Sequence, residues 1–147
     1  MLLRRAFLVG SVLWLAAIPL AAFAAGRPSA ASAAYACALG VYAIGHVVCH
    51  QLPVRSFHLW NTSLPVCARC TGIYLGAAVT ALVHASRPSQ STRFGGQARV
   101  VLLVACIPTA LTLIFEWTTG ITPANWIRAL AGLPLGAAVA WAIGMVN

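Results

Sequence analysis

Residues 100–117, VVLLVACIPTALTLIFEW, decide the fold because they form a long apolar run with a single charge, Glu116. A helix needs about 20 such residues to cross the hydrocarbon core of a bilayer. The whole chain agrees, since 61% of its 147 residues are hydrophobic and 7% are charged. Soluble domains carry about 25% charged residues. The sequence therefore predicts an integral membrane protein and excludes a soluble one.

Four further apolar runs surround this stretch, at residues 7–25, 30–50, 67–84 and 126–146. Backbone polar groups in lipid must be paired within their own segment, and none of the runs alternates as a barrel strand would. We expect an all-α fold, an integral membrane bundle of about five transmembrane helices. The runs leave no room for a soluble domain, so residues 1–147 are expected to form a single transmembrane domain.

The segment at residues 1–25 has two interpretations. Arg4 and Arg5 precede its apolar run, and small residues at Ala22, Ala24 and Ala25 end it. This pattern is typical of a first spanning helix, which we favour, but also of a signal peptide. Four helices would remain if the segment were a cleaved signal.

Small residues recur at helical spacing in two of the predicted helices. One row contains Gly72 and Gly76, continued by Thr80 and His84. The other contains Gly132, Gly136, Ala140 and Gly144. Such rows let two membrane helices approach closely, which predicts tight packing along both.

Reactive side chains gather around a polar loop at residues 51–66. Three of the five cysteines, Cys49, Cys67 and Cys70, lie at its two ends. A hairpin connection between antiparallel helices would bring these ends together. With one histidine, the three sulfurs would make the four-ligand set of a structural zinc site. We therefore expect zinc or another transition metal on Cys49, Cys67, Cys70 and His50, with His46 as a substitute ligand.

The same cysteines are also consistent with a second hypothesis, a thiol–disulfide redox site. A C-x-x-C pair such as Cys67 and Cys70 is also the reactive pair of thiol–disulfide oxidoreductases, and Cys49 would then exchange with it. Arg69, inside the pair, is expected to lower the thiol pKa values and favour thiolates. Cys37 and Cys106 fall within helices and are expected to be small buried residues. Whether the protein is an enzyme, and which residue would be catalytic, stays open at this stage.

Glu116 is the single acidic residue of the chain. A carboxylate in a membrane segment is costly unless it is paired, and Arg128, across a turn at residues 118–124, is the predicted partner. Headgroup contact is the alternative. Arg55, Arg69 and Asn125 are expected to support this polar pair, and with five spans it would lie on the same side of the membrane as the cysteines.

The basic charge of the chain does not indicate nucleic acid. Its nine positive residues are all arginines, scattered singly or in pairs, whereas phosphate backbones require clustered cations. The expected partner is the lipid bilayer, with a protein partner at the cytoplasmic face as a further expectation. Arg4 and Arg5 favour an N-terminus inside the cell, which would place the cysteines in the cytoplasm. A bacterial inner membrane is the expected location.

Three blocks in order resemble a family of small bacterial and archaeal membrane proteins, catalogued as domain of unknown function 2085. The blocks are Cys49-His50-Gln51, Arg55-Ser56-Phe57 and the stretch from Pro65 to Gly76 containing Cys67, Arg69, Cys70 and Gly72. Asn125 and Arg128 are similar to the last helix of that family. The resemblance covers residues 36–136 and implies a multi-helix membrane fold, but no activity.

Overall fold

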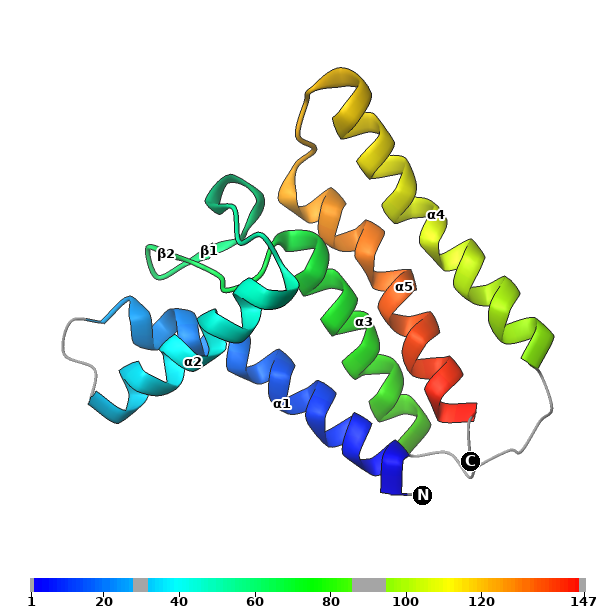
Figure 1. The fold of residues 1–147 in the computed structure, drawn as a ribbon, viewed down its shortest axis with the longest axis horizontal. Helices are drawn as coiled ribbons and strands as arrows, with labels where there is room; N and C mark the ends of the chain where they lie inside the picture. Colours follow the sequence, from blue (N-terminus) through cyan, green and yellow to red (C-terminus); the bar gives the residue numbers. More distant parts are fainter. Residues whose placement is uncertain (1, 28–31, 86–94, 146–147) are drawn as a thin grey trace.

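The computed structural model describes residues 2–27, 32–85 and 95–145, and these are mostly helical (Figure 1). The helices are α1 (Leu2–Ala25), α2 (Ser32–Val48), α3 (Ala68–Ala85), α4 (Gly95–Thr119) and α5 (Asn125–Met145). Between α2 and α3 lie a 3-10 turn, η1 (Pro53–Arg55), and two short strands, β1 (His58–Leu59) and β2 (Thr62–Ser63). The connections between the predicted runs 7–25 and 30–50, and between 67–84 and 100–117, lie partly outside the described residues, and α4 already begins at Gly95.

Three helices in the described part of the chain are long and apolar enough to cross a membrane. They are Arg5–Ala25, Gln97–Thr119 and Asn125–Gly144. Large apolar side chains on them point outward, as Leu13 and Leu103 show, each 63% exposed. Such exposure fits contact with lipid rather than water. The prediction of a helical membrane protein is confirmed, whereas the number of crossings is not.

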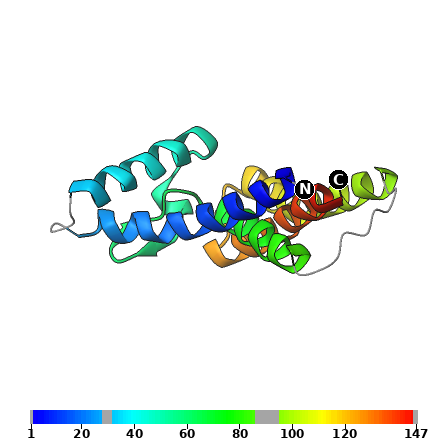
Figure 2. The ribbon, with the colours of Figure 1, turned by 90° about the horizontal axis from the view of Figure 1, so that it is seen from below.

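Four helices form a layer in the order α1, α3, α5, α4, and α2 lies beside α1 on one face of it (Figures 1 and 2). With 17 residues, α2 is shorter than the three helices that are long and apolar enough to cross a membrane. The start of α1 and the end of α5 lie at the same end of the layer (Figure 1). An odd number of full crossings would instead separate them.

The arrangement of α1 and α2 differs from the five-span prediction in where the cysteine loop lies relative to Arg4 and Arg5. The loop between α2 and α3 packs against Ile18 and Ala22 of α1. Thirteen residues of helix, about 20 Å, separate Ile18 from Arg5. The five-span prediction placed Arg4, Arg5 and the cysteine loop on one face. In the structure the start of α1 and that loop lie at opposite ends of the layer, and α2 lies alongside α1 (Figure 1).

The tightest contact of the layer joins α3 and α5 through glycine. A Cβ atom added to Gly72 would collide with the carbonyl oxygen of Ala129, and one added to Gly136 with that of Ile73. Gly76 and Gly132 meet backbone atoms of the opposite helix in the same way. Both predicted rows of small residues therefore pack against each other.

The connection between α2 and α3 contains a hairpin that the sequence did not indicate. Leu59 pairs with Thr62 across the two residues Trp60 and Asn61. Both have positive φ angles, 51° and 63°, as a two-residue hairpin turn of this twist requires. Trp60 packs edge-on against Phe23 of α1, with ring centroids 5.0 Å apart. This contact fixes the hairpin to the end of α1.

The turn between α4 and α5 follows the prediction for residues 118–124. α4 ends where Gly120 takes a φ of 68° and its N–H donates to the carbonyl of Glu116. A left-handed glycine after the last helical residue is a common way to end a helix.

We predict that Gly136→Ala destabilises the protein, because its new methyl group overlaps the backbone of α3. Overpacking of this kind costs about 1–3 kcal/mol. Loss of helical circular dichroism with temperature, measured in detergent micelles, reports the change. Gly40→Ala is the matched control, since open space surrounds Gly40 and alanine favours the helix by about 1 kcal/mol. Equal melting temperatures for the two variants would contradict the prediction.

Candidate metal centre

The sulfur atoms of three cysteines meet at the start of α3. The Sγ atoms of Cys49, Cys67 and Cys70 lie within 4.8 Å of one another. The backbone N–H of Cys67 donates a hydrogen bond to Sγ of Cys49, at 3.2 Å. All five cysteines, each within the described residues, are free thiols. The predicted convergence of two chain segments at one point is present.

Gln51 holds the two segments together. Its side-chain Nε2 donates to the carbonyl oxygen of Tyr42 in α2, at 2.7 Å, and to that of Pro65, at 2.6 Å. Gln51 itself has a φ of 49°, a left-handed conformation that is uncommon outside glycine. The two hydrogen bonds set Pro65, and with it Cys67, against the end of α2, where Cys49 lies.

Gly45 makes this close approach possible. A Cβ atom there would collide with the carbonyl oxygen of Pro65 and lie 2.7 Å from Nε2 of Gln51. The N–H of Cys49 donates to the carbonyl of Gly45 at 2.8 Å, which extends the last turn of α2 to the cysteine.

The sulfur atoms lie in an apolar setting. Cys49 is 8% exposed and belongs to a buried cluster with Ile18, Ala22, Leu64 and Val66. Cys67 and Cys70 pack against this cluster together with Trp14, Phe57 and Tyr74. An apolar surround strengthens electrostatic interactions within the site.

Cys67 is the thiol most disposed to ionise. Its pKa is lowered to about 5, first because the Cys70 thiol donates a hydrogen bond to its sulfur. Hydrogen bonds from the backbone of Cys70 and from Cys49, and the positive charge of Arg128, act in the same direction against burial. The sequence assigned this role to Arg69, but its guanidinium reaches Thr112 and Glu116 of α4 instead.

The three sulfurs fit a transition-metal ion. Two thiolates bound to one tetrahedral zinc ion at about 2.3 Å lie about 3.8 Å apart, so side-chain movements of roughly 1 Å would close the set. The predicted histidine ligands are placed differently. His46 and His50 are both exposed, and neither belongs to the described group of converging ligand atoms. The structure thus brings together three of the predicted ligands and leaves both histidines outside the group.

A second cluster surrounds Glu116, whose side chain is 3% exposed. Its Oε1 lies 2.9 Å from Nε of Arg128 and 3.1 Å from Nη2 of Arg69. Its Oε2 lies 3.8 Å from Nη1 of Arg55. The predicted Glu116–Arg128 pair is therefore present, within a group of one carboxylate and three arginines that joins α3, α4, α5 and η1.

Polar contacts also fix the loop to the start of α5. Nδ2 of Asn125 donates to the carbonyl oxygen of Ser56 at 3.0 Å, and Nη1 of Arg128 donates to that of Arg55 at 3.4 Å. Ser56 is fully buried and its hydroxyl donates to the carbonyl of Leu52. The cysteine loop and the α4–α5 turn consequently lie at the same end of the bundle, as predicted.

Sequence reasoning missed the positioning residues Gln51, Gly45 and Thr112. The left-handed backbone of Gln51 has no signal in a single sequence. For Gly45, the only sequence signal of its role was its position one helical turn before Cys49. Thr112 lies one turn before Glu116, so helical spacing gave a usable signal that it shares a face with the carboxylate. The expectation that Cys37 and Cys106 are buried was wrong, because both are exposed on the surface of the chain.

We predict that Glu116→Gln destabilises the protein by about 3–5 kcal/mol, because it leaves buried guanidinium groups without a counter-charge. Arg55→Gln is the control, with a loss of about 0–1 kcal/mol, because the side chain of Arg55 is 40% exposed and partly solvated. Denaturant unfolding in mixed micelles measures both. A smaller loss for Glu116→Gln than for Arg55→Gln would show that the carboxylate does not hold the cluster together.

Comparison with known proteins agrees with this membrane architecture. A family described as "Predicted membrane protein (DUF2085)" matches residues 49–142. An uncharacterized protein of Methanothermobacter thermautotrophicus is 36% identical over 94 residues, which cover 63% of this chain and 81% of that protein.

A second relative and the solved structures complete the comparison. Uncharacterized protein MJ1492 of Methanocaldococcus jannaschii is 43% identical over 44 residues, 30% of this chain and 28% of that protein. The match thus spans little more than a quarter of the Methanocaldococcus protein. No solved structure gives a significant match. The family match runs from Cys49 through α5, and the chain therefore belongs to this family of membrane proteins, DUF2085.

Proposed function

We propose that this membrane protein binds one transition-metal ion, zinc or a similar thiophilic metal, through Cys49, Cys67 and Cys70. The single observation that carries the proposal is the convergence of three free thiols within 4.8 Å of one another. Soft thiolate ligands favour zinc and Cu(I). A four-cysteine iron–sulfur cluster is a poorer fit, because Cys37 in α2 and Cys106 in α4 do not belong to the converging group.

The fourth metal-ligand position has a candidate in the chain. His50 directly follows Cys49 and its side chain is exposed, so a local rearrangement on metal binding would have to bring its ring to the sulfurs. His46 lies one turn earlier on α2 and is the substitute. A group supplied by a partner protein is the other source of a fourth ligand. The site would be mainly structural in the first case and a docking point in the second.

A structural metal has a clear task in this loop. Residues 51–66 connect α2 to α3, and within the described chain only β1 and β2 give this connection a strand pairing. A metal held by cysteines from both ends would cross-link them, and the free energy of binding would then add to the free energy of folding.

We predict about one metal ion per chain in protein purified without chelator, measured by inductively coupled plasma mass spectrometry. Cys67→Ser and Cys70→Ser each remove it, because two thiolates hold the ion too weakly. Cys106→Ser is the matched control and keeps the metal. His50→Ala lowers the stoichiometry if histidine is the fourth ligand and leaves it unchanged if a partner supplies that ligand. Metal far below one per chain in the unaltered protein would reject the proposal.

A membrane thiol–disulfide oxidoreductase is the second candidate. Cys67 and Cys70 would join in a disulfide while two electrons pass to a quinone or to a disulfide of a partner, and Cys49 would exchange with the pair. This candidate is favoured by the separation between the start of α1 and the cysteine loop, which packs against Ile18 and Ala22 near the other end of that helix (Figure 1). With α1 oriented by Arg4 and Arg5 toward the cytoplasm, the thiols would face the oxidising side of the membrane.

We predict for this second candidate that thiol trapping in growing cells finds a fraction of Cys67 and Cys70 oxidised, and that Cys49→Ser changes this fraction. Membrane-impermeant maleimide applied to intact cells and to inverted vesicles supplies the sidedness of the loop. A bacterial inner membrane is the proposed location. Cysteines that stay reduced under all growth conditions would eliminate the redox candidate and leave the metal site.

A further inference from the structure

The arginine cluster at Glu116 carries more positive charge than its carboxylate neutralises. Arg55, Arg69 and Arg128 contribute three charges against one from Glu116, which is the only acid of the sequence. Arg128 is 1% exposed and the side chain of Arg69 is 12% exposed. Buried charge without a counter-ion is unfavourable by several kcal/mol. A further anion at this place would remove that penalty.

The cluster also holds donors that are not used. Nε of Arg69 and Nε of Arg128 are buried and have no hydrogen-bond partner among the described residues. Nε of Arg128 lies close to Oε1 of Glu116 but is not aligned for a hydrogen bond. Guanidinium groups pair with phosphate through two parallel N–H donors. Arg55, 40% exposed, leaves the cluster open to the outside.

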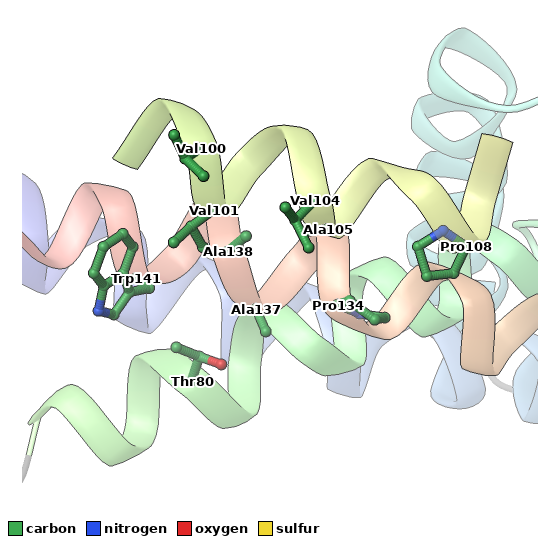
Figure 3. Close-up of a pocket in the computed structure, with 10 residues that line it drawn as sticks. All are labelled: Thr80, Val100, Val101, Val104, Ala105, Pro108, Pro134, Ala137, Ala138 and Trp141. Atoms are coloured by element: carbon green, nitrogen blue, oxygen red, sulfur yellow. The ribbon is translucent and has the colours of Figure 1, made fainter. Parts of the chain in front are cut away.

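An apolar groove of about 640 Å³ lies along α3, α4 and α5, the three helices that also carry Arg69, Glu116 and Arg128. Val101, Val104 and Ala105 of α4 face Ala137, Ala138 and Trp141 of α5 across it, and Thr80 of α3 borders it (Figure 3). Its volume is typical of ligand pockets, which range over about 300–1,000 Å³.

The end of the groove nearest the cluster is lined by Pro108, about two helical turns before Glu116 on α4. Between them, four residues after Pro108, the hydroxyl of Thr112 accepts a hydrogen bond from Nη2 of Arg69. From Pro108 to Val100 the groove extends about 12 Å along α4. The cationic cluster and the apolar groove thus lie in line along α4, separated by about two helical turns.

We propose that a phosphate-bearing anionic lipid binds here, with its headgroup phosphate at Arg55, Arg69 and Arg128 and one hydrocarbon chain in the groove between α3, α4 and α5. Both halves of the site are needed to select this ligand. Free phosphate would satisfy the charge but leave the groove unfilled. A helix from a second copy would fill the groove but bring no carboxylate, since the only acid of each chain is already enclosed by its own arginines.

The test uses the full chain, purified in detergent and mixed with phosphatidylglycerol or phosphatidylcholine, with bound lipid counted by native mass spectrometry. We expect one phosphatidylglycerol per chain, retained at least about tenfold better than phosphatidylcholine. Arg55→Gln should lower this retention about tenfold, the effect of one lost charge-assisted hydrogen bond. Arg27→Gln removes the same charge from an exposed position two residues after the end of α1 and should change retention little.

The groove is tested separately. Val104→Trp blocks it at a position that is 58% exposed, so the variant should fold, and circular dichroism checks this. Leu103→Trp, on the outer surface of the same helix, is the control. We expect Val104→Trp to release phosphatidylglycerol and Leu103→Trp to keep it.

Three results would overturn the proposal. Equal retention of the two lipids, or equal losses for Arg27→Gln and Arg55→Gln, would mean that no anion site exists. Displacement of the lipid by inorganic phosphate, with Val104→Trp neutral, would assign the site to a free anion. A lipid-free dimer that Val104→Trp dissociates would assign the groove to a second copy. The metal content of these variants is measured in parallel, so failure here is distinguishable from failure of the cysteine site.

Discussion

The close approach of α3 and α5 is the contact on which the rest of the structure depends. Carbonyl oxygens of one helix occupy the space where side chains of the other would begin, at Gly72, Gly76, Gly132 and Gly136. In lipid, where apolar side chains gain little from leaving the solvent, such packing is a main source of helix association. It sets Arg69, at the start of α3, against the first turn of α5, where Arg128 lies. Both polar sites are arranged around this point.

The cysteine group and the arginine cluster at Glu116 lie on opposite sides of the start of α3. Cys67 and Cys70 pack toward α1, next to Trp14 and Ile18, whereas Arg69 reaches Glu116 on α4. The residues from Cys67 to Cys70 therefore contact two neighbouring helices, α1 through the cysteines and α4 through Arg69. Thiolates bound to a metal would carry net negative charge, and the arginine cluster is net positive, so the two sites are electrostatically complementary across one helix turn. The charge of Arg128 already acts on the thiol of Cys67.

A single carboxylate can organise so many arginines because the site is shielded from water. At low effective dielectric the attraction between Glu116 and each guanidinium exceeds its value at a protein surface. The same conditions make unpaired charge costly, which is why the excess positive charge of the cluster is informative. Asn125 and Arg128 extend the network to the backbone of Ser56 and Arg55. The loop that carries Cys67 is thus held from α5 as well as from α2.

Sequence patterns alone were enough to predict the membrane character, the helices, the pairing of Glu116 with Arg128, the two glycine rows and the meeting of Cys49, Cys67 and Cys70. These depend on composition and on spacing along a helix or across one connection. Only the folded structure shows the features that depend on the direction of the chain in space. These are the position of α2 beside α1 and the exposed positions of His46 and His50. The hydrogen bonds of Gln51, with its left-handed backbone, are a further feature of this kind. A single sequence records periodicity well, because it reflects repeated local geometry. It does not record how far a helix crosses a bilayer or how one residue turns the chain, since each follows from many weak contacts acting together.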